Sequence, residues 1–248
     1  RIQHSIDGLL VWSLSSAALW AYSACPSNSD NMSDLYKALD FYSVDELYTE
    51  EERMIRDTVR SWVSDRFMPV IEEHNLAGTF PNDLIPELGE MGVFGASLEG
   101  YGCAGLSPVA SGLICQELER GDSGLRSFVS VQGSLCMYPI HAYGTEEQKQ
   151  KYLPKMATGE LIGCFGLTEA DFGSNPGGML TKAVEDGDHY VLNGSKYWIT
   201  NGSMAHVAIV WAKLDGVVRG FIVDCDTPGF QGKGIKNKFS LRASDTSE

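Results

Sequence analysis

Positive charge is scarce in this sequence: 19 Lys and Arg residues stand against 33 Asp and Glu residues among 248, which gives a formal net charge of -14. Such a chain repels phosphate backbones, so we expect no nucleic-acid partner. A phosphorylated cofactor stays open, because backbone N–H groups, helix starts and one or two local cations can hold a phosphate. With 43% hydrophobic and 21% charged residues, the composition is typical of a globular protein.

Paired cysteines and zinc-like Cys/His spacings are also lacking, and no GxGxxG dinucleotide-binding fingerprint follows a strand. The six cysteines are scattered: Cys25, Cys103, Cys115, Cys136, Cys164 and Cys225. We therefore expect free, reduced thiols and no metal site. A reducing interior, either the mitochondrial matrix or a bacterial cytoplasm, fits this usage.

Long apolar runs are rare, and the one near the start of the chain needs separate treatment. Leu9 to Cys25 is a run of seventeen nearly uncharged residues, at the short limit of roughly 17 to 25 for a membrane-spanning helix. A polar break follows, and Met32 begins a helix-prone segment. We interpret residues 1–31 as a leader or another segment outside the folded domain.

The first half of the remaining chain reads as helices. Ser43 to Glu73 has apolar residues at three- and four-residue spacings, and Thr49 with Glu52 has the spacing of a capping box. Pro69 is expected to end or kink this helix. Further helices are predicted for residues 82–91, 107–120, 145–156 and the small-residue stretch after Asp122.

The residue pattern of the sequence changes after Gly159, where short β-branched and aromatic runs alternate with Asp-Gly and Asn-Gly turns. This pattern predicts an antiparallel sheet domain. Two of its segments can carry chemistry, CFGLTEADFGSNP (164–176) and KYWITNG (196–202). The first is a strand end entering a loop rich in N–H groups, and strand alternation would put Trp198 and Thr200 of the second on one face. Taken separately, such segments are most often an ordinary turn and a core tryptophan.

Together, in this order and after a helical half, the two segments resemble the acyl-CoA dehydrogenase family. GYGCAG (100–105) and FSLRAS (239–244) are most similar to the glutaryl-CoA dehydrogenase branch. The resemblance implies an α+β fold, with an N-terminal helical bundle over residues 32–160. A small antiparallel β-barrel or sandwich, the middle domain, would span residues 161–248. The family's C-terminal helical domain, which carries the catalytic base, is expected beyond Glu248, so the chain as given is expected to be inactive alone.

The resemblance also assigns candidate site residues. Those for FAD are Phe165, Gly166, Leu167, Thr168, Ser174, Trp198, Ile199 and Thr200. Hydrogen bonds from the loop would tune the flavin, and the indole would pack on its ring system. Those for the acyl-CoA substrate are Arg126, Ser127, Ser130 and Ser174.

Arg126 carries the argument about substrate class. It lies four residues before Ser130, so both face the same way on a helix that we expect to be nearly buried. Without the resemblance, an ion pair with Glu117 or Glu119, or a side chain reaching to solvent, explains it equally well. With the resemblance, Arg126 and Ser130 match the pair that binds the distal carboxylate of a glutaryl group.

The implied reaction is the oxidative decarboxylation of glutaryl-CoA to crotonyl-CoA and CO2, with electron-transfer flavoprotein as acceptor, in a homotetramer. The resemblance also implies a place in lysine degradation, in tryptophan degradation and in fatty acid metabolism. Two alternatives stay open: a dehydrogenase for a neutral short or branched acyl-CoA, and a non-catalytic acyl-CoA- or partner-binding module. The acidic residues Glu117, Glu119, Glu169 and Asp171 are expected to be solvated or to cap local structure rather than to act as bases.

Overall fold

The computed structural model describes residues 41–248. The contacts divide the chain after Tyr42, and Ser43–Glu248 form one compact unit. The predicted leader, residues 1–31, lies outside the described residues. Among the described residues, no helix combines the length and apolar character needed to cross a membrane.

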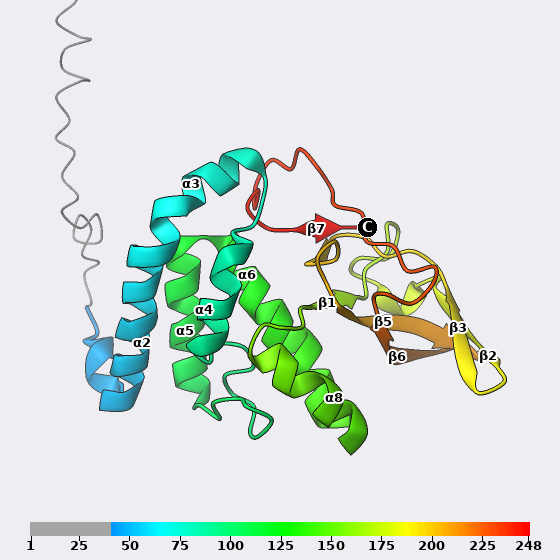
Figure 1. The fold of residues 1–248 in the computed structure, drawn as a ribbon, viewed down its shortest axis with the longest axis horizontal. Helices are drawn as coiled ribbons and strands as arrows, with labels where there is room; N and C mark the ends of the chain where they lie inside the picture. Colours follow the sequence, from blue (N-terminus) through cyan, green and yellow to red (C-terminus); the bar gives the residue numbers. More distant parts are fainter. Residues whose placement is uncertain (1–40) are drawn as a thin grey trace, which may run out of the picture. The chain divides into compact units, whose positions relative to one another are not determined.

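The amphipathic helix expected at the start of the fold is present, but it starts and ends later than predicted and is divided into three stretches. After a short 3-10 turn, η2 (Val44–Leu47), the helix α2 (Glu50–Trp62) begins with the predicted capping box between Thr49 and Glu52. A π-helical stretch, η3 (Val63–Phe67), then leads directly into α3 (Met68–Ala77). Pro69 therefore does not end the helix. It occupies the first turn of α3, where a backbone N–H has no carbonyl partner within that helix, so a residue without an N–H is tolerated. Figure 1 shows the change of direction between α2 and α3.

The other predicted helices are present, each with local signals at its ends. Ser107 caps α5, Asp122 caps α6, and Thr145 and Gln148 form a capping box at α8. The bounds are η4 (Asn82–Leu84), α4 (Ile85–Glu90), α5 (Pro108–Gly121), α6 (Ser123–Ser130), the π-helical η5 (Val131–Met137), α7 (Tyr138–Tyr143) and α8 (Glu146–Ala157).

An apolar core holds this helical part together. Phe128 on α6 stacks on Phe80, with ring centroids 4.5 Å apart, and meets Phe94 edge to face at 5.9 Å. Leu88, Leu118 and Leu153 are fully buried around them. Each such side chain contributes roughly 1.5–3 kcal/mol on burial, so the stripe of small and apolar residues on α6 is what fixes this helix in the centre.

The second half forms a sheet domain, but its main sheet is mixed. The antiparallel pairs are β2 (Lys182–Asp186) with β3 (His189–Asn193), and β5 (Val207–Leu214) with β6 (Val217–Asp224). β5 also pairs in parallel with β1 (Gly163–Gly166) and with the start of β2. The chain returns through the β2–β3 hairpin before β5, and this long connection permits parallel pairing.

A second, two-stranded sheet joins β4 (Ile199–Thr200) to β7 (Thr246–Ser247), and a 3-10 turn, η6 (Pro176–Gly178), precedes β2. Among the described residues the strands do not close into a barrel. The predicted α+β fold class is thus confirmed in its sandwich-like form, and the purely antiparallel expectation is wrong for β1, β2 and β5.

One buried side chain joins the helices to the sheet. Gln132 on η5 donates from Nε2 to the carbonyls of Met156 (3.0 Å) and Leu161 (2.7 Å), and its Oε1 accepts the N–H of Gly163 at 2.7 Å. Gly163 also lies so close to Cys136 that a Cβ there would be 2.6 Å from the cysteine Cβ. These contacts fix the start of β1 against η5, and β1 leads into the first candidate segment.

Candidate functional site

The first candidate segment begins in β1 and continues into a loop. Phe165 points from β1 toward Trp211 of β5, and their ring centroids are 6.0 Å apart. Gly166 is buried, and a Cβ at this position would lie 3.3 Å from Cγ of Lys196. Leu167 and Thr168 then leave the strand half-buried. A glycine at this strand end lets the Lys196 side chain pass directly behind the loop.

The second segment has a backbone that strand alternation does not predict. Trp198 has a φ of 61°, in the left-handed region, and only Ile199 and Thr200 after it are in β4. The expectation that Trp198 and Thr200 share a face of one strand is therefore wrong. A left-handed conformation disfavours a bulky residue by about 1–2 kcal/mol, so the surrounding contacts must hold it. The Trp198 indole is 57% exposed, in T-shaped contact with Tyr197.

The two segments meet in one cavity of about 270 Å³. We call it the β1–β4 cavity, and it is lined by Val131, Leu135, Phe165, Leu167, Thr168, Trp198, Ile199 and Thr200. Six of the eight residues predicted for the cofactor thus lie together. Gly166 lies behind the wall rather than in it, and Ser174 is exposed in the following loop.

Two lining residues were missed by the sequence reasoning. Val131 and Leu135 come from η5, four positions apart and therefore on the same side of the helix. Leu135 remains 38% exposed, although it is a large apolar side chain. The sequence does contain this apolar pair, shortly after Ser130. That the pair lines a cavity follows only from the contact of η5 with β1, which the sequence alone does not show.

The cavity has a flat aromatic wall and two free hydroxyls. Neither the Thr168 nor the Thr200 hydroxyl has a hydrogen-bond partner among the residues that the structure describes. Complete ligand pockets usually measure roughly 300–1,000 Å³, so a cavity of this size suits one planar ring system rather than a whole dinucleotide. None of its eight lining residues carries a carboxylate in the described part of the chain.

Directly behind the cavity lies an ion pair between Glu169 and Lys196, with Nζ 2.9 Å from Oε1. Glu169 also accepts the N–H groups of Leu180 (2.6 Å) and Thr181 (3.0 Å) and the Thr181 hydroxyl. Burial alone would raise the pKa of Glu169, but the bonds from Thr181, Leu180 and Lys196 outweigh it and lower the pKa to about 2. Of the two expected roles, the solvated one is wrong, since the Glu169 side chain is 8% exposed, while its bonds to two backbone N–H groups are those of a residue that caps local structure.

Three of the four predicted substrate residues, Arg126, Ser127 and Ser130, lie on α6, while Ser174 lies in the exposed loop described above, and none of the four lines the β1–β4 cavity. Arg126 is 37% exposed rather than nearly buried, and its Nε donates to Glu119 at 2.7 Å. Its Nη1 lies 3.3 Å from the Ser130 hydroxyl, while Nη2 has no partner among the described residues. Ser127 contributes only its carbonyl, which accepts from Ser130.

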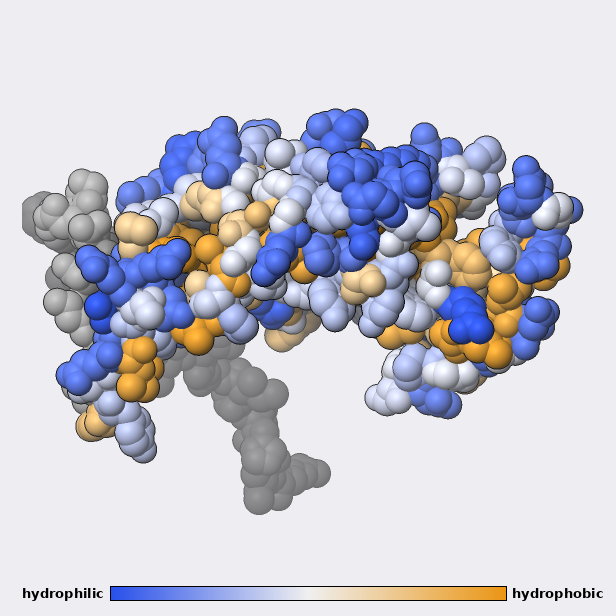
Figure 2. Space-filling model, turned by 90° about the horizontal axis from the view of Figure 1, so that it is seen from below, coloured by the Kyte–Doolittle hydropathy of each residue, from blue (hydrophilic) through white to orange (hydrophobic). Residues whose placement is uncertain are grey.

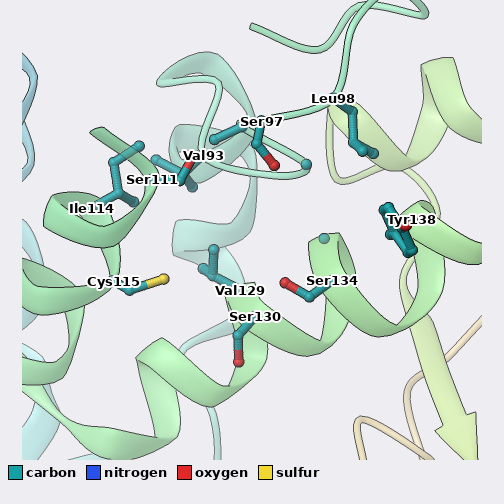
Figure 3. A pocket seen from close by; sticks show the side chains of 13 residues that line it. Val93, Ser97, Leu98, Ser111, Ile114, Cys115, Val129, Ser130, Ser134 and Tyr138 are labelled. Atoms are coloured by element: carbon teal, nitrogen blue, oxygen red, sulfur yellow. The ribbon is translucent and has the colours of Figure 1, made fainter. Parts of the chain in front are cut away.

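Ser130 opens into a second cavity, of about 250 Å³, which we call the α5–α6 cavity. Figure 3 shows Ser130 and Ser134 on one side of it, Ser111 and Cys115 on another, and Ser97 above. Its lining combines hydroxyls and a thiol with apolar groups and includes no charged side chain in the part of the chain described. Arg126 itself is not part of this lining.

Of the other carboxylates expected to be solvated or to cap local structure, Glu117 differs from that expectation, whereas the Glu119 side chain is 44% exposed and agrees with it. Glu117 is fully buried between Arg60 and Arg120, and Glu119 is bound to Arg126 and the Ser123 hydroxyl. Burial would raise the pKa of Glu117, but the bond from Arg60 lowers it overall. Figure 2 shows hydrophilic residues along the upper edge of one face of the molecule and at both of its ends, with hydrophobic residues exposed between them.

Comparison with known proteins identifies both halves. The N-terminal domain of acyl-CoA dehydrogenases matches residues 49–160, and the middle domain of the same family matches residues 164–248. These two stretches coincide with the helical part and the sheet domain.

Solved structures and curated proteins agree with this. A glutaryl-CoA dehydrogenase from Mycobacterium smegmatis, solved in complex with FADH2, is 55% identical, with a TM-score of 0.83 over 84% of this chain and 54% of that chain. The probable acyl-CoA dehydrogenase YngJ of Bacillus subtilis is 38% identical over 81% of this chain and 54% of its own length.

The short-chain-specific acyl-CoA dehydrogenase of Clostridium acetobutylicum is 36% identical over the same shares, 81% and 54%. The chain thus spans about half the length of the curated relatives that it matches. The helical part, the sheet domain and both family matches lead to one conclusion: the chain belongs to the acyl-CoA dehydrogenase family.

Proposed function

We propose that the chain forms the FAD- and acyl-CoA-binding part of an acyl-CoA dehydrogenase that converts glutaryl-CoA to crotonyl-CoA and CO2. In this proposal residues 32–160 form the N-terminal domain and residues 161–248 the middle domain. Electron-transfer flavoprotein would accept the electrons, and the whole enzyme would be a homotetramer.

The observation that carries the cofactor part is the β1–β4 cavity. Phe165 and Trp198 supply aromatic walls, and the Thr168 and Thr200 hydroxyls are free to bond a heterocycle. These residues fit the isoalloxazine ring of FAD, which when bound accepts a hydride from the acyl β carbon. The chain's own contribution is to hold the ring, to exclude water with the indole and to donate hydrogen bonds from Thr168 and Thr200.

The substrate part depends on Arg126. Its Nη2 edge is free, so a carboxylate can accept from Arg126 there. The Ser130 hydroxyl accepts from Nη1 and donates to the Ser127 carbonyl, so it adds a second bond to that carboxylate only if its O–H turns away from this carbonyl. Glu119 neutralises part of the guanidinium charge but leaves this outer edge available. A glutaryl group carries such a carboxylate at the end of its acyl chain.

A neutral acyl chain is the second candidate. Glu119 already partners Arg126, and the α5–α6 cavity beside Ser130 has no charged lining in the described chain. Both features suit the end of an uncharged acyl group, so this candidate makes the opposite prediction in the substrate test below.

Flavin binding tests the cofactor part. The purified chain is mixed with FAD, separated from free flavin by gel filtration, and its visible spectrum recorded. We expect flavin to elute with the protein, and Thr168→Val to weaken binding while the matched change Thr158→Val, on the exposed end of α8, does not. Flavin that elutes only in the free fractions would contradict the proposal.

Ligand discrimination tests the substrate part. Glutaryl-CoA and butyryl-CoA are titrated into the FAD-loaded chain, and binding is followed by the flavin absorption bands. A charged hydrogen bond contributes about 1.5–3 kcal/mol, so Arg126→Met should weaken glutaryl-CoA binding by roughly 10- to 150-fold and leave butyryl-CoA binding nearly unchanged. Arg66→Met, which removes another ion-paired arginine, is the control. Equal binding of both ligands before and after the Arg126 change would favour the neutral substrate.

A further inference from the structure

Thr168 and Trp198 belong to segments about thirty residues apart, and the β1–β4 cavity needs both in fixed positions. The direct backbone link between the segments is a single hydrogen bond, from the Tyr197 N–H to the Thr168 carbonyl at 2.8 Å. Trp198 follows immediately, in the left-handed conformation and with its indole largely exposed. Neither packing of the indole nor strand pairing therefore fixes Trp198. The contacts of neighbouring residues in the chain must hold its strained backbone in the left-handed conformation.

Lys196 is the neighbour that is best held. Its Nζ donates to the carbonyl of Leu167 at 3.0 Å and to Glu169 at 2.9 Å, so it binds on both sides of Thr168. Its side chain is 11% exposed, and its methylene stem lies against Gly166. The lysine thus clamps the loop that carries Thr168 while standing two residues before Trp198.

Glu169 is held equally well from the other side. Its carboxylate accepts hydrogen bonds from the Leu180 and Thr181 N–H groups and from the Thr181 hydroxyl. These bonds fix the carboxylate in place independently of Lys196. Gly194 packs directly on Thr181, since a Cβ there would lie 2.3 Å from the Thr181 hydroxyl. The pair is therefore anchored to the start of β2 as well as to the loop.

We propose that the Glu169–Lys196 ion pair is a positioning device that sets the Thr168 loop and the Trp198 indole relative to each other for a planar ring bound in the β1–β4 cavity. Neither side chain lines the cavity, so both act through the groups in front of them. The inference rests on the proposed function where it identifies the ring as FAD. The mechanical part, that the ion pair fixes the Thr168 loop and Trp198 relative to each other, does not depend on that function.

Amide hydrogen exchange in the flavin-free chain tests the mechanical part. Lys196→Met keeps the stem and removes the charge, and it should speed exchange of the Tyr197 amide by about tenfold or more, because its acceptor on Thr168 is no longer held. Amides of α2 and α5 should exchange as in the unchanged chain. Lys155→Met, which breaks the exposed pair with Glu160, is the matched control and should leave Tyr197 unaffected.

Two results would overturn the inference: no change at Tyr197, or an equal rise at every amide, which would indicate general destabilisation. If Lys196→Met fails to fold, Glu169→Gln is the second variant. Its side-chain amide has the same shape as the carboxylate and can still accept the hydrogen bond from the Leu180 N–H. It should give the same local effect at Tyr197.

Flavin readouts test the functional part. With FAD added, Lys196→Met should lower the affinity on the order of tenfold and shift the flavin reduction potential, whereas Lys155→Met should change neither. Unchanged affinity and potential in Lys196→Met would refute a positioning role. If the unaltered chain binds no FAD, the proposed function fails while the exchange result still decides whether the ion pair holds the two segments.

Discussion

Glu117 on α5 accepts a bidentate pair of hydrogen bonds from Arg60 on α2, with Nη2 at 2.8 Å from Oε1 and Nε at 3.0 Å from Oε2. Arg120 donates to the same carboxylate at 3.0 Å. The glutamate is 1% exposed, while the two arginines are 44% and 39% exposed. The buried charge is thus the carboxylate, and the arginines are the partners that can turn to solvent.

This asymmetry predicts which change destabilises more. Replacing both arginines, by Arg60→Met with Arg120→Met, leaves a buried carboxylate with no cationic partner and only the long bond from Gln116 at 3.4 Å, and should lower the free energy of unfolding by about 3–5 kcal/mol. Glu117→Gln frees two arginines that already reach water and should lower it by only about 1–3 kcal/mol. Urea unfolding at pH 7 measures both, and the reverse order would contradict the account.

The ion pair behind the β1–β4 cavity predicts a pH dependence. The folded pKa of Glu169 is about 2, below its ordinary value of 4.5. A lowered carboxyl pKa adds stability above the unfolded pKa, and this stability is lost as the pH falls from about 4.5 toward 2. The shift corresponds to about 3 kcal/mol.

The free energies of unfolding of the unaltered chain and of Glu169→Gln should therefore differ by about this amount at pH 7 and converge only as the pH falls to about 2. Glu160→Gln, at an exposed position, is the control and should show almost no difference at either pH. A gap between Glu169→Gln and the unaltered chain that stays constant with pH would contradict the assignment.

A third prediction concerns the thiols. A hydrogen bond from Cys164 lowers the pKa of Cys225, which is half-buried, and the same contact with burial raises the pKa of Cys164. Burial raises the pKa of Cys103 and Cys115. Because the thiolate is the reactive form, iodoacetamide at pH 7.5 should label Cys225 first among the described cysteines.

Peptide mass spectrometry over a time course measures the order of labelling. Cys164→Ala removes the hydrogen bond to Cys225 and should slow its alkylation, although it also opens space. Faster labelling of Cys103 or Cys115 than of Cys225 would show that exposure, rather than thiolate content, decides the order.

The sequence was sufficient to predict those features of the fold that depend on a few neighbouring residues. The capping box at Thr49 and the helix starts at Ser107 and Thr145 were readable because a few neighbouring residues determine them. The two cofactor segments were found by resemblance, and the structure gathers most of their residues in one cavity. Whether those residues bind FAD stays a prediction for the flavin experiment.

Long-range features were out of reach. The parallel pairing of β5 with β1 depends on the path of the chain between them rather than on either strand. Glu169 seemed solvated because its partner Lys196 is 27 residues away. The half-exposed position of Arg126 likewise follows from how α6 packs, which its composition of small residues did not reveal.

The backbone of Trp198 gives the last prediction, because it separates strain from ligand contact. Asparagine adopts the left-handed conformation more readily than most residues, whereas a β-branched residue is an outlier there. Trp198→Asn and Trp198→Val both remove the indole, which is mostly exposed and contributes little burial. The free energy of unfolding should therefore be about 1–2 kcal/mol higher for the Asn variant than for the Val variant.

Flavin binding should respond differently, since both variants lose the aromatic wall and should bind FAD equally weakly. Urea unfolding and flavin titration on the same two proteins measure the two effects. Equal stability of the variants would mean that the left-handed backbone at Trp198 relaxes when the indole is removed. In that case the indole itself, and not the bonds of Lys196 and Tyr197, would set the conformation of this segment.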